Sequence, residues 1–311
     1  MASAFSPDQY RALHEGAGFI VREDRGRIVL RGADRKSYLH GLLSNDIEAL
    51  QPGGSCYATL LTAQGRMISD MRVFDLGDLL LLDLESAVTA VVAEHLDKFV
   101  ITEDVSVDET TASSGQIGVY GPNARQVLDA TVSATGAPPL FVVESSDLGV
   151  DGFDVIVPRA RVEEWTNALA RAGALPVTRD TVDVTRVEAG IPRFLVDMDT
   201  ATIPLEAGIE ERAISMSKGC YVGQEVIVRV LHRGGGRVAK KLVALVLEGE
   251  AQRGDRLFAG EREIGRITSA VHSPRLGKRL ALGYVQRDFV EPGTQLTVPT
   301  ADGTLAAVVV T

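Results

Sequence analysis

Hydrophobic residues recur in the first half of the chain as short alternating runs, and stretches with a helical period separate these runs. The run "GRIVLRG" predicts a strand, and the following "ADRKSYLHGLLSNDI" predicts a helix with Asp34 as its N-cap. The inward face of that helix would carry Tyr38, Leu39, Leu42 and Leu43. A series of strands is predicted in "CYATLLTAQGRMISDMRVFDLGDLLLLDLE", with turns at Gln64-Gly65 and Gly77-Asp78.

A second amphipathic helix is predicted in "AVTAVVAEHLDKFV". Its inward face would carry Val88, Val91, Val92, Leu96 and Phe99. The same order then begins again, because "QIGVYGPNARQVL" predicts a strand, a turn and a helix, and "RVEEWTNALARAG" predicts a further helix. Single helices that cross between strand pairs predict an α+β fold with two sandwich units of the ferredoxin-like type.

The pattern of hydrophobic and polar residues changes after "RGGGRV" at Arg233–Val238. The remaining stretches, from "KKLVALVLEG" to "TQLTVPTADGTLAAVVVT", are short strands with Gly or Pro turns and no helical period. They predict a C-terminal antiparallel barrel or sandwich of about 75 residues, which is a plausible size for a small domain.

Composition and charge narrow the class of protein. The chain has 311 residues, of which 45% are hydrophobic and 24% charged, as in globular proteins. A formal net charge of -10 argues against general binding to nucleic acid or to an anionic membrane. We find no apolar run that could span a bilayer and no secretory signal, so we expect a cytoplasmic protein. The two cysteines, Cys56 and Cys220, form neither a disulfide framework nor a zinc motif, and we expect no metal site.

Cys220 lies in the stretch "SKGCYVGQEVIVR". Lys218 could stabilise a thiolate, and Gly219 and Gly223 would let the backbone approach a ligand closely. A buried packing cysteine is the competing interpretation, since free cysteines often behave as small hydrophobic residues. From the residues alone, a functional thiol and a buried packing residue are both possible interpretations of Cys220.

A second candidate site lies in "DVTRVEAGIPRF", where Arg186 and Glu188 flank a valine. A carboxylate here could accept two hydrogen bonds from adjacent N–H groups, such as those of a pterin or a guanine. A third candidate is Asp70, which follows Ser69 in "TAQGRMISDMRVF" and could serve as a general base. For Glu188 the simpler interpretation is an exposed helix glutamate, and for Asp70 it is a polar residue on the face of a strand.

The stretch "RVLHRGGGRVAKK" contains Arg229, Arg233, Arg237, Lys240 and Lys241 and no acidic residue. This stretch is therefore positively charged, whereas the chain as a whole carries a net negative charge. It could receive a polyanionic tail or an RNA backbone, or it could be a solvated linker between domains.

These stretches together resemble one family along nearly the whole chain. "KGCYVGQE" is similar to the signature of the YgfZ-type folate-binding proteins, called CAF/IBA-type iron–sulfur cluster assembly factors in mitochondria. These proteins are relatives of the aminomethyltransferase T-protein of the glycine cleavage system. The stretches "LRGADRKSYLHGLLSNDI", "YATLLTAQGRMISDMRVF", "TRVEAGIPRF" and "IPLEAGIE" follow in the family's order.

The resemblance implies a T-protein-like, three-domain cloverleaf that binds tetrahydrofolate or a folate derivative. It would consist of a discontinuous folate-binding domain (1–52 with 112–232), an interleaved ferredoxin-like domain (53–111) and a C-terminal β-barrel (233–311). Glu188 would correspond to the glutamate that holds the pterin edge. The remaining folate-binding residues that we predict are Arg186, Phe153, Lys218, Gly219, Tyr221, Gly223, Gln224 and Glu225.

One departure bears on activity. The T-protein has an Asp-Asp pair in its central hairpin, one member of which is catalytic, whereas this chain has Ser69-Asp70. The resemblance therefore implies a folate-binding accessory role in iron–sulfur cluster assembly or maintenance, which indirectly supports tRNA modification. Its partners would be iron–sulfur proteins or their assembly machinery, and the predicted catalytic residues are Cys220 and Asp70. The alternative is a tetrahydrofolate-dependent aminomethyltransferase.

Overall fold

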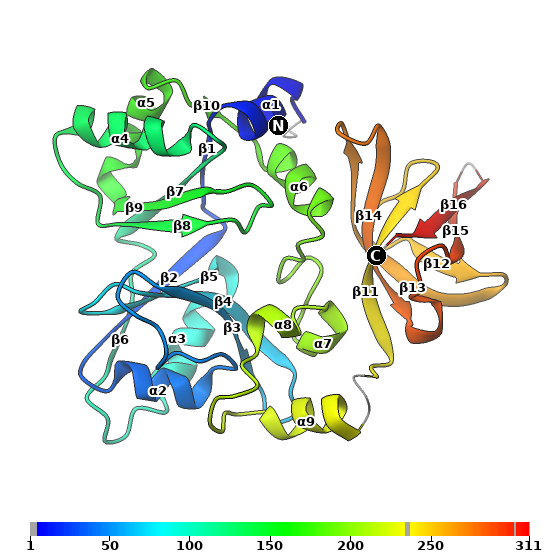
Figure 1. The fold of residues 1–311 in the computed structure, drawn as a ribbon, viewed down its shortest axis with the longest axis horizontal. Helices are drawn as coiled ribbons and strands as arrows, with labels where there is room; N and C mark the ends of the chain where they lie inside the picture. The colour runs from blue at the N-terminus through cyan, green and yellow to red at the C-terminus, as the bar shows by residue number, and fades with distance from the viewer. Residues whose placement is uncertain (1–4, 234–236, 302, 311) are drawn as a thin grey trace. The chain divides into compact units, whose positions relative to one another are not determined.

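The computed structural model describes residues 5–233, 237–301 and 303–310, and it contains three sheets (Figure 1). The chain divides into two compact units. Unit 1 comprises Met1–Gly26 and Thr110–Ile191, and unit 2 comprises Arg27–Glu109 and Pro192–Thr311. The α+β class is confirmed, and so is the C-terminal antiparallel barrel. The domain boundaries that we derived from the sequence stay a prediction.

Unit 1 is built around a five-stranded sheet with the order β10-β1-β7-β9-β8. Its strands are β1 (Gly18–Val21), β7 (Ser114–Tyr120), β8 (Phe141–Ser145), β9 (Gly152–Pro158) and β10 (Leu175–Pro176). Its helices are α1 (Pro7–Glu15), α4 (Ala124–Thr135), η2 (Arg159–Arg161), α5 (Val162–Arg171) and α6 (Arg179–Glu188).

The two faces of this sheet differ in chemistry. Trp165 and Leu169 of α5 and Leu128 of α4 form an apolar core with inward residues of β7 and β9 such as Val119 and Val155. The alternate residues of the same strands, which include Gln116, Tyr120 and Asp154, are buried but polar. One face is therefore an apolar core, and the other combines buried hydrogen-bonding groups with a smaller apolar cluster that contains Tyr120 and Leu13.

The α+β part of unit 2 contains a second five-stranded sheet, with the order β3-β4-β5-β2-β6. Its strands are β2 (Arg25–Arg31), β3 (Ser55–Leu61), β4 (Met67–Asp75), β5 (Leu80–Glu85) and β6 (Ser106–Glu109). The helices here are α2 (Arg35–Leu42), η1 (Ser86–Val88) and α3 (Thr89–Asp97). Leu39 of α2 and Leu96 of α3 pack with Met71 and Val73 of β4, so both helices cover the same face of the sheet.

The structure confirms Asp34 at the N-cap position of α2 but without a side-chain cap, and it shows that the inward positions predicted for Val91 and Phe99 are wrong. Asp34 is the residue before α2, but its side chain caps no helix amide and instead accepts a hydrogen bond from the Asp104 backbone N–H at 2.8 Å. On α3, Val91 is 58% exposed, because it lies about 100° around the helix from the buried Val92. Phe99 follows the helix end and is 43% exposed.

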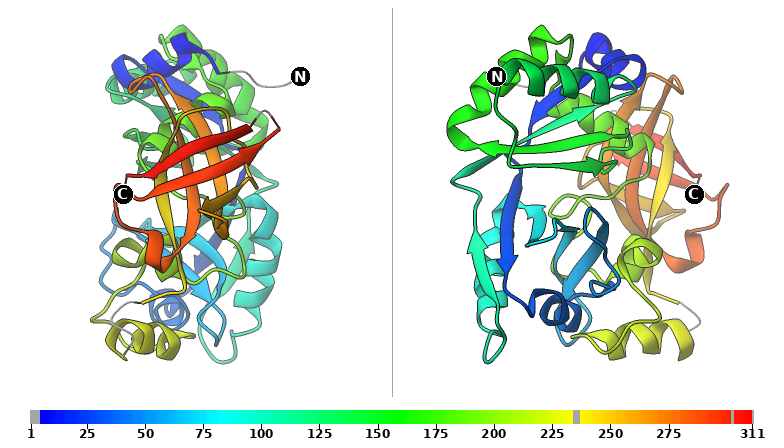
Figure 2. Two further views of the ribbon diagram at one scale, coloured as in Figure 1. Left: turned by 90° about the vertical axis from the view of Figure 1, so that its right-hand side faces the viewer. Right: turned by 60° about the vertical axis from the view of Figure 1, so that its left-hand side comes forward.

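The rest of unit 2 begins with short helices and ends with the barrel (Figure 2). The helices are α7 (Pro204–Ala207), α8 (Glu210–Ala213), α9 (Gln224–Val228) and the π-helical turn η3 (Arg229–Arg233). The closed barrel has the order β11-β14-β13-β12-β15-β16. Its elements are β11 (Lys240–Leu247), β12 (Arg256–Ala259), β13 (Arg262–Ser273), β14 (Lys278–Gln286), η4 (Arg287–Phe289), β15 (Gln295–Thr300) and β16 (Gly303–Val309).

The stretch that we singled out for its positive charge is divided in this structure. Arg229 begins η3, and Lys240 and Lys241 begin β11. The side chain of Arg233 and residues 234–236 lie outside the described residues.

Candidate functional site

Glu188 is the last residue of α6 in unit 1, and its side chain is half-buried. The Tyr10 hydroxyl of α1 donates a hydrogen bond to Glu188 Oε2 at 2.7 Å, and the Tyr10 ring stacks on His14 at 4.1 Å. A carboxylate at the C-terminal end of a helix is disfavoured by the helix dipole. The helix itself therefore gives no electrostatic reason for an acid at this position.

Arg186 and Phe153, the other predicted folate residues of unit 1, both contact protein groups. The buried Arg186 guanidinium donates to Asp183 Oδ1 at 2.6 Å and to the Ile191 carbonyl at 3.1 Å. Arg186 therefore anchors the backbone that follows α6 through its hydrogen bond to the Ile191 carbonyl. Phe153 lies on β9 beneath the Arg125 guanidinium, which is 4.0 Å from the ring centroid.

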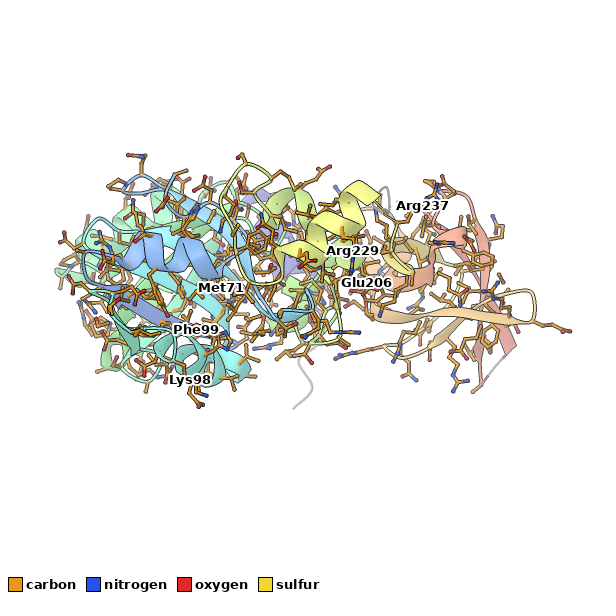
Figure 3. All side chains as sticks on the ribbon, turned by 90° about the horizontal axis from the view of Figure 1, so that it is seen from below. Met71, Lys98, Phe99, Glu206, Arg229 and Arg237 are labelled. Carbon is orange, nitrogen blue, oxygen red and sulfur yellow. The ribbon has the colours of Figure 1, made fainter. Side chains whose placement is uncertain are left out.

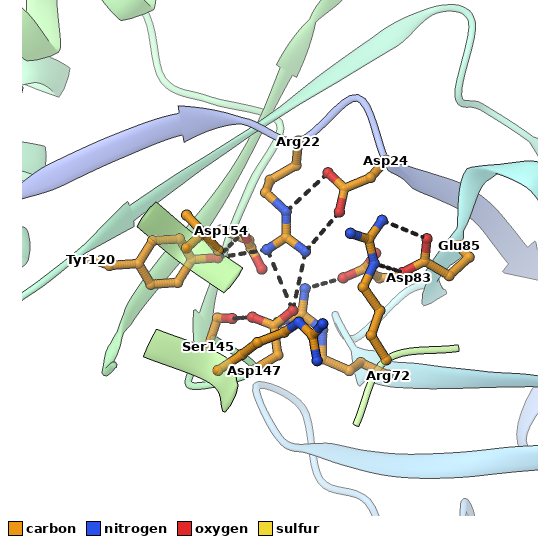
Figure 4. A network of polar contacts seen from close by, with 12 residues as sticks. Arg22, Asp24, Arg72, Asp83, Glu85, Tyr120, Ser145, Asp147 and Asp154 are labelled. Carbon is orange, nitrogen blue, oxygen red and sulfur yellow. Dashed lines mark hydrogen bonds and ion pairs between the residues drawn. The ribbon is translucent and has the colours of Figure 1, made fainter. Parts of the chain in front are cut away.

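The polar face of the unit 1 sheet carries a buried network that our sequence analysis missed (Figure 4). Arg22 is 5% exposed and donates to the Tyr120 hydroxyl at 3.0 Å. It also donates to Asp24 at 3.3 Å and to Asp147 at 3.3 Å. The Tyr120 hydroxyl in turn donates to Asp154 at 2.9 Å. Asp24 is a sequence neighbour of Arg22, but Tyr120 and Asp147 lie 98 and 125 residues away, so no local motif marks the network.

Asp70 lies on the polar face of the unit 2 sheet, opposite to the face that α2 and α3 cover. It is 7% exposed, and the Tyr57 hydroxyl donates to its Oδ2 at 2.7 Å. Arg212 of α8 lies over the Tyr57 ring, 5.0 Å from its centroid. A buried carboxylate that a tyrosine orients is a plausible general base or ligand group.

Two ion pairs also lie on this polar face, and Figure 4 labels Arg72, Asp83 and Glu85, which belong to them. Arg72 pairs with Asp83 across neighbouring strands. Arg193 binds both oxygens of Glu85 at 3.0 Å, which is a bidentate geometry. Since Asp83 and Glu85 are nearly fully buried, the two arginines provide their charge compensation.

Ser69, which precedes Asp70, has a different environment. It is fully buried, and its hydroxyl donates to the Asp70 backbone carbonyl at 2.7 Å. A serine in this position supplies no carboxylate, so Asp70 is the only acid of this dipeptide.

Lys218 connects the cysteine loop to α2. Its ammonium group donates to the backbone carbonyls of His40 and Leu43, at 2.5 Å for Leu43, and it lies 4.9 Å from the Tyr221 ring centroid. Burial lowers the pKa of Lys218 to about 8, although the nearby Asp46 carboxylate opposes that shift. The lysine that we expected to activate a thiol thus satisfies carbonyls at the end of a helix.

The other loop residues divide into exposed and packed ones. Cys220 is exposed, as is Gly219, whereas Tyr221 is 7% exposed and burial raises its pKa to about 12. Gly223 has a φ of 85° and precedes α9, whose first turn contains Gln224 and Glu225. The buried-packing interpretation is therefore wrong for Cys220.

The second cysteine has a different environment. Cys56 of β3 is half-buried, and burial raises the pKa of its thiol to about 12.

The structure thus places the predicted site residues in two groups. Glu188, Arg186 and Phe153 belong to unit 1, and Asp70 and the loop residues 218–225 belong to unit 2. Among the described residues, no three His, Cys, Asp or Glu side chains are grouped so that they could hold a metal ion. No helix in the described ranges is long and apolar enough to cross a membrane.

An α+β protein with two five-stranded sheets and a closed C-terminal barrel is the class that this fold defines. Two family models match the chain, the GCVT N-terminal domain over residues 2–218 and the glycine cleavage T-protein C-terminal barrel domain over residues 240–311. The chain therefore belongs to the glycine cleavage T-protein family.

Curated relatives agree with this family. The aminomethyltransferase of Thermosynechococcus vestitus is 29% identical over 319 residues, which cover 97% of this chain and 86% of the relative. The aminomethyltransferase of Streptomyces coelicolor is 27% identical over 309 residues, which cover 93% of this chain and 83% of the relative.

A solved structure has the same fold. The glycine cleavage system aminomethyltransferase T from Bartonella henselae matches with a TM-score of 0.89 and 20% identity. The match covers 99% of this chain and 90% of that one.

Proposed function

We propose that this chain binds tetrahydrofolate and that the Glu188 carboxylate holds the pterin ring. The observation that carries the proposal is the half-buried Glu188 carboxylate, which Tyr10 orients at 2.7 Å and which lies at the unfavourable end of its helix. Such a carboxylate fits the paired N–H groups of a pterin, because it can accept hydrogen bonds from both. When bound, tetrahydrofolate supplies the nitrogen atoms that carry a one-carbon unit.

Calorimetric titration with tetrahydrofolate tests this proposal. We expect the wild-type chain to bind and the Glu188→Gln variant to bind about tenfold or more weakly, since a charge-assisted hydrogen bond contributes about 1.5–3 kcal/mol. The exposed Glu163 of α5 provides a matched control, and Glu163→Gln should bind as the wild type does. Equal affinity of wild type and Glu188→Gln would exclude the pterin assignment.

The comparisons favour aminomethyl transfer as the activity, because the matched relatives carry that name. Asp70 is the residue that we assign to it, since its carboxylate is buried and held by Tyr57. With an aminomethylated lipoyl carrier and tetrahydrofolate, the products would be methylene-tetrahydrofolate, ammonia and the dihydrolipoyl carrier. Asp70→Asn should lower this rate about 100-fold or more, as expected for loss of a general base. If the wild type binds folate but forms no product, the transferase assignment is wrong.

A second candidate function is the YgfZ-type accessory role in iron–sulfur cluster assembly or maintenance, in which a cytoplasmic setting is expected. Two observations favour it: the exposed Cys220 thiol and the serine at position 69. A thiolate is a suitable ligand for iron–sulfur chemistry. Cells that carry only the Cys220→Ala variant should lose activity of a cluster-dependent enzyme under oxidative stress, whereas Cys56→Ala cells should keep it. Unchanged activity in Cys220→Ala cells would remove the thiol from this role.

A further inference from the structure

An open pocket of about 420 Å³, here called the cavity, lies on the surface at one end of the C-terminal barrel, where β11 begins and β14 ends. Its lining consists of Arg237, Val238, Lys241, Arg287, Asp288 and Val290. Mouths of β-barrels are common places for small-molecule sites, and this volume lies within the usual range for them, roughly 300–1,000 Å³. The cavity belongs to neither group of site residues described above.

The direction of Lys241 follows from the register of β11. Val243, Leu245 and Leu247 alternate along this strand and are all buried in the barrel core. Lys241 continues the same alternation by one position toward the strand start, opposite Val285 of β14. Its side chain therefore begins on the inward side of the barrel wall and reaches the mouth.

The cavity has an excess of positive charge. It contains three cationic side chains and one carboxylate, and that carboxylate, Asp288, pairs with Arg287 at 3.4 Å. In the described part of the chain, Arg237 and Lys241 form no ion pair or side-chain hydrogen bond. The lining thus leaves two positive charges uncompensated, in a chain whose formal net charge is -10. Figure 3 labels Arg237 where the chain enters the barrel.

We propose that this barrel mouth binds a small organic phosphate. Two uncompensated cations match the charge of a phosphate monoester, about −1.5 to −2 at neutral pH. Arginine guanidinium groups bind phosphate oxygens in a bidentate geometry, and Lys241 adds a point charge. Val238 and Val290 provide an apolar wall for the organic part of the ligand. Of the basic stretch, Arg237 and Lys241 belong to this lining.

Titration with inorganic phosphate and with methyl phosphate, followed by phosphorus NMR, tests this proposal on the full chain. We expect both to bind, and we expect Lys241→Gln and Arg237→Gln to weaken binding about tenfold each. Arg275 provides a charge-matched control, because it lies in the exposed turn at the opposite end of β14. Arg275→Gln should bind phosphate as tightly as the wild type.

Three outcomes would overturn the proposal. One is a wild-type chain that binds neither phosphate, and another is an Arg275→Gln variant that loses as much affinity as Lys241→Gln. The third is equally tight binding of succinate, a dianion without phosphate geometry. Circular dichroism of each variant separates loss of binding from loss of the fold.

Discussion

The Lys218 ammonium group, in a loop that the sequence marks as functional, has two backbone carbonyls as its acceptors. These carbonyls belong to His40 and Leu43 at the end of α2, where a helix leaves its last C=O groups without intrahelical partners. Burial keeps the pKa of Lys218 near 8, so the ammonium form pays a desolvation cost in the folded protein. Against that cost stand the two hydrogen bonds to the α2 carbonyls, which would lose this donor without Lys218.

We predict that Lys218→Met lowers the free energy of unfolding by about 1–3 kcal/mol at pH 7, because one buried and one partly buried carbonyl lose this donor. The pKa of Lys218 falls from 10.5 to about 8 on folding, so between these values the unfolded state binds more protons than the folded state. Wild-type stability should therefore rise with pH in this window, relative to the variant, by at most about 1.4 kcal/mol per pH unit. Urea unfolding at several pH values measures this difference. Lys98→Met, at an exposed site on the C-terminal side of α3, should change neither quantity.

At the scale of elements, the β3–β4 turn and the start of α9 pack closely against each other. A Cβ atom on Gly223 would lie 2.5 Å from the Thr62 carbonyl oxygen and 3.1 Å from the Leu61 side chain. The φ of 85° at Gly223 also disfavours any residue with a side chain. By contrast, the one atom of the described residues within 4 Å of a Cβ on Gly219 would be His40 Nε2, at 3.8 Å.

Gly223→Ala should therefore destabilise the protein by about 2 kcal/mol or more, through steric overlap with backbone and unfavourable φ. Gly219→Ala should change the free energy of unfolding by less than about 0.5 kcal/mol. Thermal unfolding of both variants in the absence of folate measures these effects. Equal destabilisation by the two substitutions would contradict our assignment of Gly223 to packing.

The two glycines also illustrate what the sequence could and could not predict. Alternation and period predicted β2 and β7, one from each sheet, the helix α5 and the barrel, because burial imposes those patterns locally, but they did not predict the short strands β1 and β10. The packed Gly223 and the exposed Gly219 look alike in the sequence, since their difference depends on a turn some 160 residues away. The Arg22 network escaped prediction for the same reason, because its partners Tyr120 on β7 and Asp147 after β8 lie close to Arg22 only in the folded chain.

At the scale of the whole chain, the two units differ in how they are assembled. The sheet of unit 1 needs β1, from the first segment of the unit, between β10 and β7 from the second. The barrel, by contrast, consists of one continuous segment and closes on itself through the pairing of β11 with β16. Closure removes free strand edges, and Leu245, Ile267 and Val298 belong to a core that only barrel segments supply.

We therefore predict that a fragment from Arg237 to the end of the chain folds alone, whereas a fragment of residues 110–191 does not. The barrel fragment keeps its six strands and its core, although a domain of this size is only marginally stable. The 110–191 fragment would leave the β7 edge and the Val119 face without β1. Proton NMR spectra should show dispersed amide signals and cooperative thermal unfolding for the barrel fragment alone. A collapsed, undispersed spectrum of that fragment would mean that contacts from outside the barrel, such as those from Asp197 to Thr268 and Ser269 at 2.6 Å, are required for folding.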